Sequence, residues 1–119
     1  FLWHQRVVFR YERQQAGIQD TFTMELHVLR VGDVAVAFNP FELFTEYGMR
    51  MKARSPAVQT FVVQLTGAGA YSGGYLPTEE AIRGGGYSAV PQSTLVGPEG
   101  GQMLVDRTVD LIGRLWTSP

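Results

Sequence analysis

Apolar and polar side chains alternate along several short stretches of this chain, and a two-residue period is typical of half-buried β-strands. Residues 21–31 show it most clearly, because every second side chain from position 22 to 28 is apolar. Residues 34–38 are apolar without interruption. Gly32-Asp33 separates the two stretches, which predicts a hairpin whose second strand is buried on both faces. Residues 59–66 predict a third strand.

The first 20 residues carry a weaker pattern. Residues 1–13 mix bulky apolar and charged side chains in short alternation, which favours an edge strand and leaves a short helix as the alternative. Residues 14–20 include Gly17 and predict a loop. The chain begins without Met and without a cap or turn signal, so we expect it to be a fragment or a processed piece of a longer protein.

Two stretches have the period of helices. Asn39 can cap a helix, Pro40 suits its first position and Glu42 has the spacing of a capping box, so a helix is predicted from here to Ser55-Pro56. From about Glu99 to Trp116, apolar residues recur at helical spacing and form a wide face. Each large side chain buried there is worth roughly 1.5–3 kcal/mol, so this helix is expected to be the main stabiliser.

The order of these elements predicts the fold class. A strand, a helix and a strand in succession favour a right-handed βαβ unit. Residues 67–87 are rich in Gly and Tyr, with one helical turn predicted at 78–83. We expect an α/β fold, in which a mixed sheet contains a β-hairpin and a βαβ unit and a long C-terminal helix packs on the sheet. Residues 1–119 form a single unit of a larger α/β domain in this interpretation.

Composition removes several classes of function. The 119 residues carry a net charge of −1 and have a pI of about 6.1, so no basic surface is expected for nucleic acid. The absence of cysteine excludes disulfides, thiol nucleophiles and cysteine zinc sites. No apolar run is long enough for a transmembrane segment. His4 and His27 stand alone in their segments, which favours surface histidines over metal ligands.

The motifs leave two candidate residues. The glycine cluster at 67–73 has Ser72 where the dinucleotide fingerprint needs Gly, and no Lys-Ser/Thr follows as in a P-loop. A Gly-x-Ser-x-Gly elbow is also missing, so a serine triad is not expected. Glu42 and Tyr75 each lie near a strand end, where sites in α/β sheets usually form. Spacing alone favours a helix-cap role for Glu42 and an aromatic clamp for Tyr75.

Seven short segments stand in a recognisable order along the chain, at residues 25–36, 40–42, 47–48, 53–56, 74–78, 85–87 and 93–98. Together they resemble the C-terminal part of the neutral/alkaline non-lysosomal ceramidase catalytic domain, over roughly residues 22–115. The resemblance is specific because all seven segments occur in the same order, whereas each segment alone is a weak signal. The resemblance implies a zinc-dependent hydrolase that cuts the N-acyl bond of ceramide, or of a related lipid amide, into a fatty acid and a sphingoid base.

The resemblance also implies site residues. In this family, zinc is held by two histidines, a glutamate and a tyrosine. Glu42 matches the glutamate and Tyr75 the tyrosine, so both are expected zinc ligands, and Tyr87 matches a tyrosine at the substrate pocket. The family has Gly where Phe41 stands, and its two metal histidines have no counterpart among these 119 residues. The resemblance further implies that the protein acts outside the cytoplasm, as a secreted or periplasmic enzyme.

The missing ligands lead to expectations for the isolated chain. Two ligands do not complete a zinc site, so the chain alone is expected to be inactive and to bind zinc weakly or not at all. Its expected partner is the remaining N-terminal part of the same domain, and self-association through a surface exposed by truncation is a further expectation. The alternative is a non-catalytic interaction or structural domain with the same fold, in which Glu42 is a cap and the tyrosine loop is a binding surface.

Overall fold

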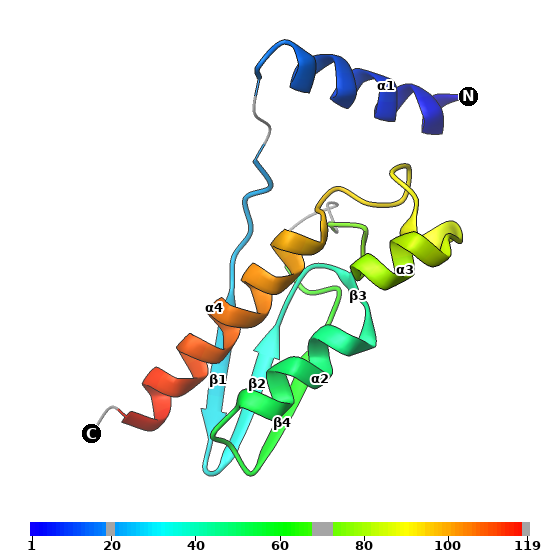
Figure 1. Ribbon diagram of the computed structural model, residues 1–119. Coiled ribbons are helices and arrows are strands. Elements are labelled where there is room, and N and C mark those ends of the chain that lie inside the picture. The colour runs from blue at the N-terminus through cyan, green and yellow to red at the C-terminus, as the bar shows by residue number, and fades with distance from the viewer. Residues whose placement is uncertain (19–20, 68–72, 118–119) are drawn as a thin grey trace.

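The computed structural model describes residues 1–18, 21–67 and 73–117, and these form two small sheets and several helices (Figure 1). In chain order, the elements are α1 (Leu2–Gln15), β1 (His27–Val31), β2 (Val34–Phe38), β3 (Glu42–Leu43), α2 (Thr45–Arg54), β4 (Gln59–Val63), β5 (Tyr75–Leu76), α3 (Glu79–Gly84), the 3-10 helix η1 (Tyr87–Ala89) and α4 (Pro98–Thr117). The larger sheet has the order β1-β2-β4, and β3 pairs with β5 in the smaller one.

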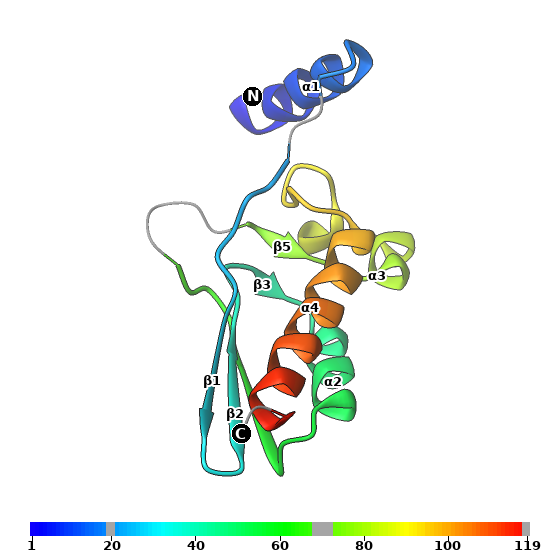
Figure 2. The ribbon, with the colours of Figure 1, turned by 90° about the vertical axis from the view of Figure 1, so that its left-hand side faces the viewer.

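The predicted fold class is confirmed. Strand β2 is antiparallel to β1 and parallel to β4, so the larger sheet is mixed and contains both the hairpin and the βαβ unit. Helices α2 and α4 lie on the same side of this sheet (Figures 1 and 2). The long C-terminal helix agrees with its predicted span of 99–116 to within one residue at each end.

The hairpin follows the sequence pattern closely. Val31 pairs with Val34, which leaves Gly32 and Asp33 as a two-residue turn. Gly32 has a φ of +60°, the left-handed region that glycine adopts without strain in tight hairpin turns. The turn prediction is therefore correct.

Strand β1 is shorter than predicted, although burial alternates as expected. Phe22, Met24 and Leu26 are half-buried, and the residues between them are exposed. The strand itself begins at His27 opposite Phe38, because β2 ends there and offers no further partner. Strand β4 also ends earlier than predicted, at residue 63.

The expectation that β2 is buried on both faces is wrong. Ala35 and Ala37 are buried on the side of α2 and α4, but Val36 on the opposite face is only half-buried. The outer face of the sheet continues onto the neighbouring strands through exposed Leu29, Val31, Phe61 and Val63. No described helix covers this side, so the second face lacks the layer that a fully buried strand needs.

Residues 1–13 are not an edge strand but form helix α1, the alternative that the sequence left open. The half-buried positions are Val7, Arg10 and Arg13, and their spacing of three is helical. The alternation in this stretch is short, and the Arg, Gln and Glu residues around it favour a helix. The helix also extends into the predicted loop, to Gln15.

The second helix begins later than predicted. Helix α2 starts at Thr45, with Phe44 rather than Asn39 at its N-cap, so the predicted capping box is wrong. The Asn39 side chain instead accepts a hydrogen bond from the backbone N–H of Phe41 (3.1 Å) and closes a local turn. This turn takes the chain into β3 before α2 can begin.

Helix α4 supplies much of the core, as its apolar face predicts. Leu104, Val105, Thr108 and Ile112 are buried along it. At Gly101 an added Cβ would lie 2.4 Å from the Tyr47 hydroxyl oxygen, so glycine is needed for the close approach of α2 and α4. The core cluster consists of Phe41, Tyr47, Met51, Leu76, Leu104 and Val105.

Candidate functional site

Glu42 and Tyr75 are brought together by the small β3–β5 sheet. The two residues are direct partners in this parallel pair, so their side chains project from the same face. The neighbouring partners Leu43 and Leu76 project from the other face, and Leu76 is completely buried in the core. Glu42 and Tyr75 are both half-buried and point away from that core.

Local sequence explains the position of each residue. The Glu42 backbone N–H donates to the carbonyl of Gly74 (3.0 Å), directly before Tyr75. Gly74 has a φ of +68°, and a Cβ there would lie 2.6 Å from the Ser93 carbonyl oxygen. Because glycine occupies position 74, the chain passes close to Ser93, whose carbonyl accepts the Tyr75 N–H (3.1 Å). Tyr75 is therefore held on both sides, by β3 and by residue 93.

The two side chains interact electrostatically. The negative charge of Glu42 raises the pKa of the Tyr75 phenol above its ordinary value of 10.0, with smaller contributions from desolvation and from a side-chain hydrogen bond to Glu42. Tyr75 is therefore a neutral hydroxyl at physiological pH. A cation bound between the two oxygens would act in the opposite direction, because positive charge favours the phenolate.

Tyr87, which the family resemblance assigns to the substrate pocket, lies next to this pair. Its ring lies edge-on to the ring of Tyr75, with centroids 5.9 Å apart and an interplanar angle of 81°. Tyr87 itself is 68% exposed. The three candidate residues Glu42, Tyr75 and Tyr87 thus form one contiguous group, here called the Glu-Tyr site.

Sequence analysis did not place Trp3 or His4 near this site. Trp3 stacks on Tyr87, with ring centroids 5.9 Å apart and an interplanar angle of 19°. The Nδ1 atom of His4 lies 3.1 Å from Nε2 of Gln92. Trp3 therefore contacts the site itself and His4 contacts the segment beside it, both from α1, which is far from these residues in the sequence, so no local spacing signals such contacts.

The donor set fits part of a zinc site. Zinc accepts carboxylate oxygen, and a phenol beside it can serve as a second oxygen ligand. Among the residues that the structure describes, no group of three or more His, Cys, Asp or Glu side chains could hold a metal ion. His27 is exposed on the outer face of the sheet, where Nε2 lies 3.1 Å from Oε2 of Glu25. The described chain therefore offers two of the four ligands that the resemblance implies.

A hollow lies elsewhere on the molecule, away from the Glu-Tyr site. It has a volume of about 720 Å³, lies on the outer side of the sheet, and is lined in part by Phe22, Met24, Leu29, Phe38 and Pro40. Neither Glu42 nor Tyr75 lines it. Its apolar lining makes it a continuation of the uncovered sheet face.

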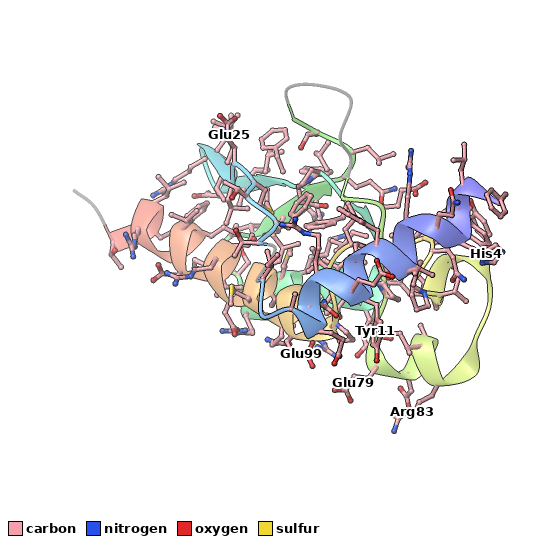
Figure 3. All side chains as sticks on the ribbon, turned by 90° about the horizontal axis from the view of Figure 1, so that it is seen from above. His4, Tyr11, Glu25, Glu79, Arg83 and Glu99 are labelled. Carbon is pink, nitrogen blue, oxygen red and sulfur yellow. The ribbon has the colours of Figure 1, made fainter. Side chains whose placement is uncertain are left out.

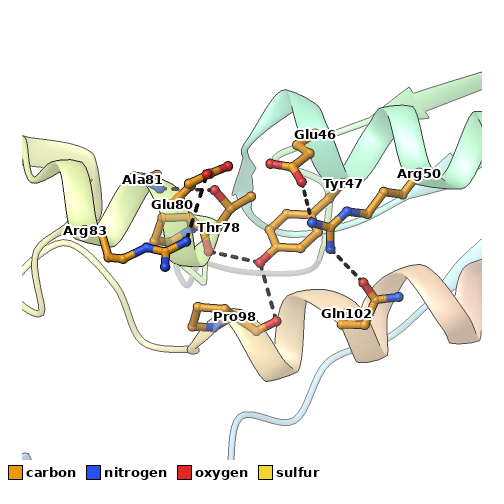
Figure 4. Close-up of polar contacts among 10 residues, drawn as sticks. Glu46, Tyr47, Arg50, Thr78, Glu80, Ala81, Arg83, Pro98 and Gln102 are labelled. Atoms are coloured by element: carbon orange, nitrogen blue, oxygen red, sulfur yellow. Dashed lines mark hydrogen bonds and ion pairs between the residues drawn. The ribbon is translucent and has the colours of Figure 1, made fainter.

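A second hollow of about 450 Å³ lies between α2, α3 and the start of α4 (Figure 4). The Tyr47 hydroxyl donates to the Pro77 carbonyl there (3.0 Å), and Arg50 contacts Glu46 and Gln102. Burial raises the pKa of the Tyr47 phenol, and the charge of Arg50 partly opposes this shift. These side chains hold the three helices together, which accounts for their arrangement without a ligand.

Most of the glycine cluster at residues 67–73 is not part of the described structure, so it contributes no residue to the site as described. Residues 68–72, including Tyr71 and Ser72, lie outside the described residues. The predicted helical turn at 78–83 is confirmed as α3, and the Thr78 hydroxyl oxygen accepts a hydrogen bond from the N–H of Ala81 (3.3 Å). Two buried residues, Leu76 and Pro77, separate Tyr75 from Thr78 in the sequence.

The chain was compared with known proteins. No protein-family model, curated protein or solved structure matches it. None of the described helices is both long and apolar enough to cross a lipid bilayer.

Proposed function

We propose that this chain carries the glutamate and tyrosine side of a zinc site in a hydrolase that cleaves the N-acyl bond of ceramide or a related lipid amide. The proposal takes its chemistry from the ordered resemblance to ceramidase catalytic domains. It takes its residues from the Glu-Tyr site. The remaining ligands, two histidines by this resemblance, come from parts of the protein outside these 119 residues.

One observation supports the proposal most strongly, which is the pairing of Glu42 with Tyr75. The rival role for Glu42 was a helix cap, but α2 begins three residues later and its N-cap is Phe44. Glu42 instead projects beside the phenol that the resemblance assigns to the same metal. The ligands of one metal ion must lie close together, and here two oxygen-bearing side chains from separate segments do so.

The chemistry of the residues is consistent with amide hydrolysis. When bound, zinc supplies a Lewis acid and lowers the pKa of its water to about 7. Glu42 would supply a carboxylate oxygen to such a site and Tyr75 a phenol oxygen, and the positive charge of a cation there would oppose the rise that Glu42 causes in the pKa of Tyr75. Tyr87, an exposed residue whose ring contacts Tyr75, would donate a hydrogen bond to a substrate carbonyl or line its pocket.

The uncovered face of the sheet supports the expected partner. Leu29, Val31, Phe61 and Val63 are between 37% and 67% exposed on one side of the larger sheet. Contiguous apolar surface of this kind usually marks an interface. It fits the remaining part of the same domain, with self-association of the isolated chain as a by-product. The same face is the observation that favours the second candidate, a non-catalytic interaction domain.

Hydrolysis by the full gene product tests the proposal. The parent is expected to release fatty acid from a ceramide, whereas Glu42→Ala and Tyr75→Phe lose most of this activity. Glu46→Ala is the matched control, because Glu46 is an exposed carboxylate nearby that pairs with Arg50 on α2. A parent without amidase activity, or a Glu42→Ala variant as active as the Glu46→Ala control, would leave the interaction domain as the better account.

A further inference from the structure

Helix α1 is attached to the rest of the molecule at its surface. None of its residues is buried, and Leu2, Val8 and Phe9 are more than half exposed. Figures 1 and 3 show α1 across one end of the molecule, outside the layers formed by the sheet, α2 and α4. An element with so little burial opens at a lower free energy than the core does.

The contacts of α1 converge on the segment that carries Tyr87. Arg10 donates from Nη1 to the carbonyl oxygen of Thr94 (2.7 Å) and from Nη2 to that of Pro91. His4 contacts Gln92, and Trp3 stacks on Tyr87. These contacts are polar anchors and one aromatic stack, all on residues 87–94.

The same segment holds Tyr75 in place. The Ser93 carbonyl accepts the backbone N–H of Tyr75, and Gly74 forms a bridge with Thr94. The ring of Tyr87 covers one edge of the Tyr75 ring. A continuous series of contacts therefore runs from Trp3 through Tyr87 and Tyr75 to Glu42.

We infer that α1 is a cover that docks on, and opens from, the aromatic side of the Glu-Tyr site. In the docked state, Trp3 holds Tyr87 against Tyr75, and Arg10 anchors the helix to the backbone beneath it. In the open state, Tyr87 loses its stacking partner and the covered edge of Tyr75 is released. The functional meaning of this motion rests on the proposed function, whereas the cover itself rests on the contacts alone.

Nitration of tyrosines by tetranitromethane, mapped by mass spectrometry, measures the motion on the 119-residue chain. Arg10→Ala is expected to raise the nitration rate of Tyr75 about tenfold and to speed amide exchange in residues 2–15, because docking is weakened. Arg6→Ala, an exposed arginine on the same helix, is the matched control and leaves both rates unchanged. Tyr47, which is buried on α2 and not part of α1, serves as the internal reference.

A crosslink tests the inference in the opposite direction. The chain has no cysteine, so the His4→Cys, Gln92→Cys double variant has a single pair of thiols that a short bifunctional reagent can join. The joined form is expected to show slower Tyr75 nitration than the unjoined form. Equal Tyr75 rates in the joined and unjoined forms, or in Arg10→Ala and the parent, would overturn the inference. Zinc and activity are not measured here, so this outcome is separate from that of the proposed function.

Discussion

Glu42 and Tyr75 lie side by side as partners in the β3–β5 pair, and the charge of Glu42 raises the pKa of the Tyr75 phenol. The pair connects two segments that the sequence separates by a helix, a strand and a glycine-rich stretch. Each residue is held by backbone hydrogen bonds that do not depend on its side chain. Substitutions of the side chains should therefore test the chemistry while leaving the local fold intact.

Removing the charge of Glu42 should lower the pKa of Tyr75. In Glu42→Gln, the phenol loses the neighbour that disfavours its ionised form, and the Tyr75 Cζ signal in an NMR titration should shift at lower pH than in the parent. In the parent, the folded state holds this proton above the unfolded value near 10, so stability is fully present below pH 10 and falls as the pH rises further. This alkaline loss should be smaller in Glu42→Gln. An unchanged Tyr75 titration would mean that the two groups do not interact in solution.

Substitution of Gly74 should destabilise the fold. In Gly74→Ala, the new Cβ meets the Ser93 carbonyl oxygen at 2.6 Å while φ stays near +68°, which should cost about 1–3 kcal/mol. Gly113→Ala in α4 is the control, because no atom lies within 4 Å of its added Cβ and alanine favours a helix by about 1 kcal/mol. Urea denaturation should move the midpoint down for position 74 and up for position 113. Two shifts in the same direction would contradict the geometry around Tyr75.

The uncovered sheet face should drive self-association of the isolated chain. Phe61 is 52% exposed on β4, and Phe61→Thr introduces a β-branched residue that suits a strand while removing most of the apolar surface. Sedimentation velocity should show less association for Phe61→Thr than for the parent. Met103→Thr changes an exposed apolar residue on α4 and should have no effect. If the parent remains monomeric at high concentration, the exposed sheet face does not drive self-association.

The local elements followed from the sequence, because their signals lie within a few residues. The hairpin has a glycine at its turn, Gly32, and helix α4 has a regular helical period of apolar residues. Neither signal competes with a different local preference. The start of α2 was mispredicted, because Asn39 has the chemistry of both a helix cap and a local turn, and hydrogen bonding to Phe41 selected the turn. The preference for an edge strand over a helix at residues 1–13 was wrong, because the alternation there is too short to outweigh helix propensity.

The site could be predicted only in part. Glu42, Tyr75 and Tyr87 were selected through the family resemblance, and the fold brings all three together. Trp3 and His4 were missed, because their contacts with Tyr87 and Gln92 depend on how α1 docks against a segment that is distant in the sequence. Such long-range contacts are set by tertiary packing and leave no periodic trace in the sequence.

The metal content of the full gene product tests the central claim most directly. Elemental analysis of the purified parent should give about one zinc per chain, because the complete ligand set of a catalytic site is then present. Glu42→Ala should lose most of this zinc, Tyr75→Phe should lose part of it, and Glu46→Ala should retain it. A parent without zinc, or one whose zinc content is the same with and without Glu42, would contradict the assignment of Glu42 as a ligand.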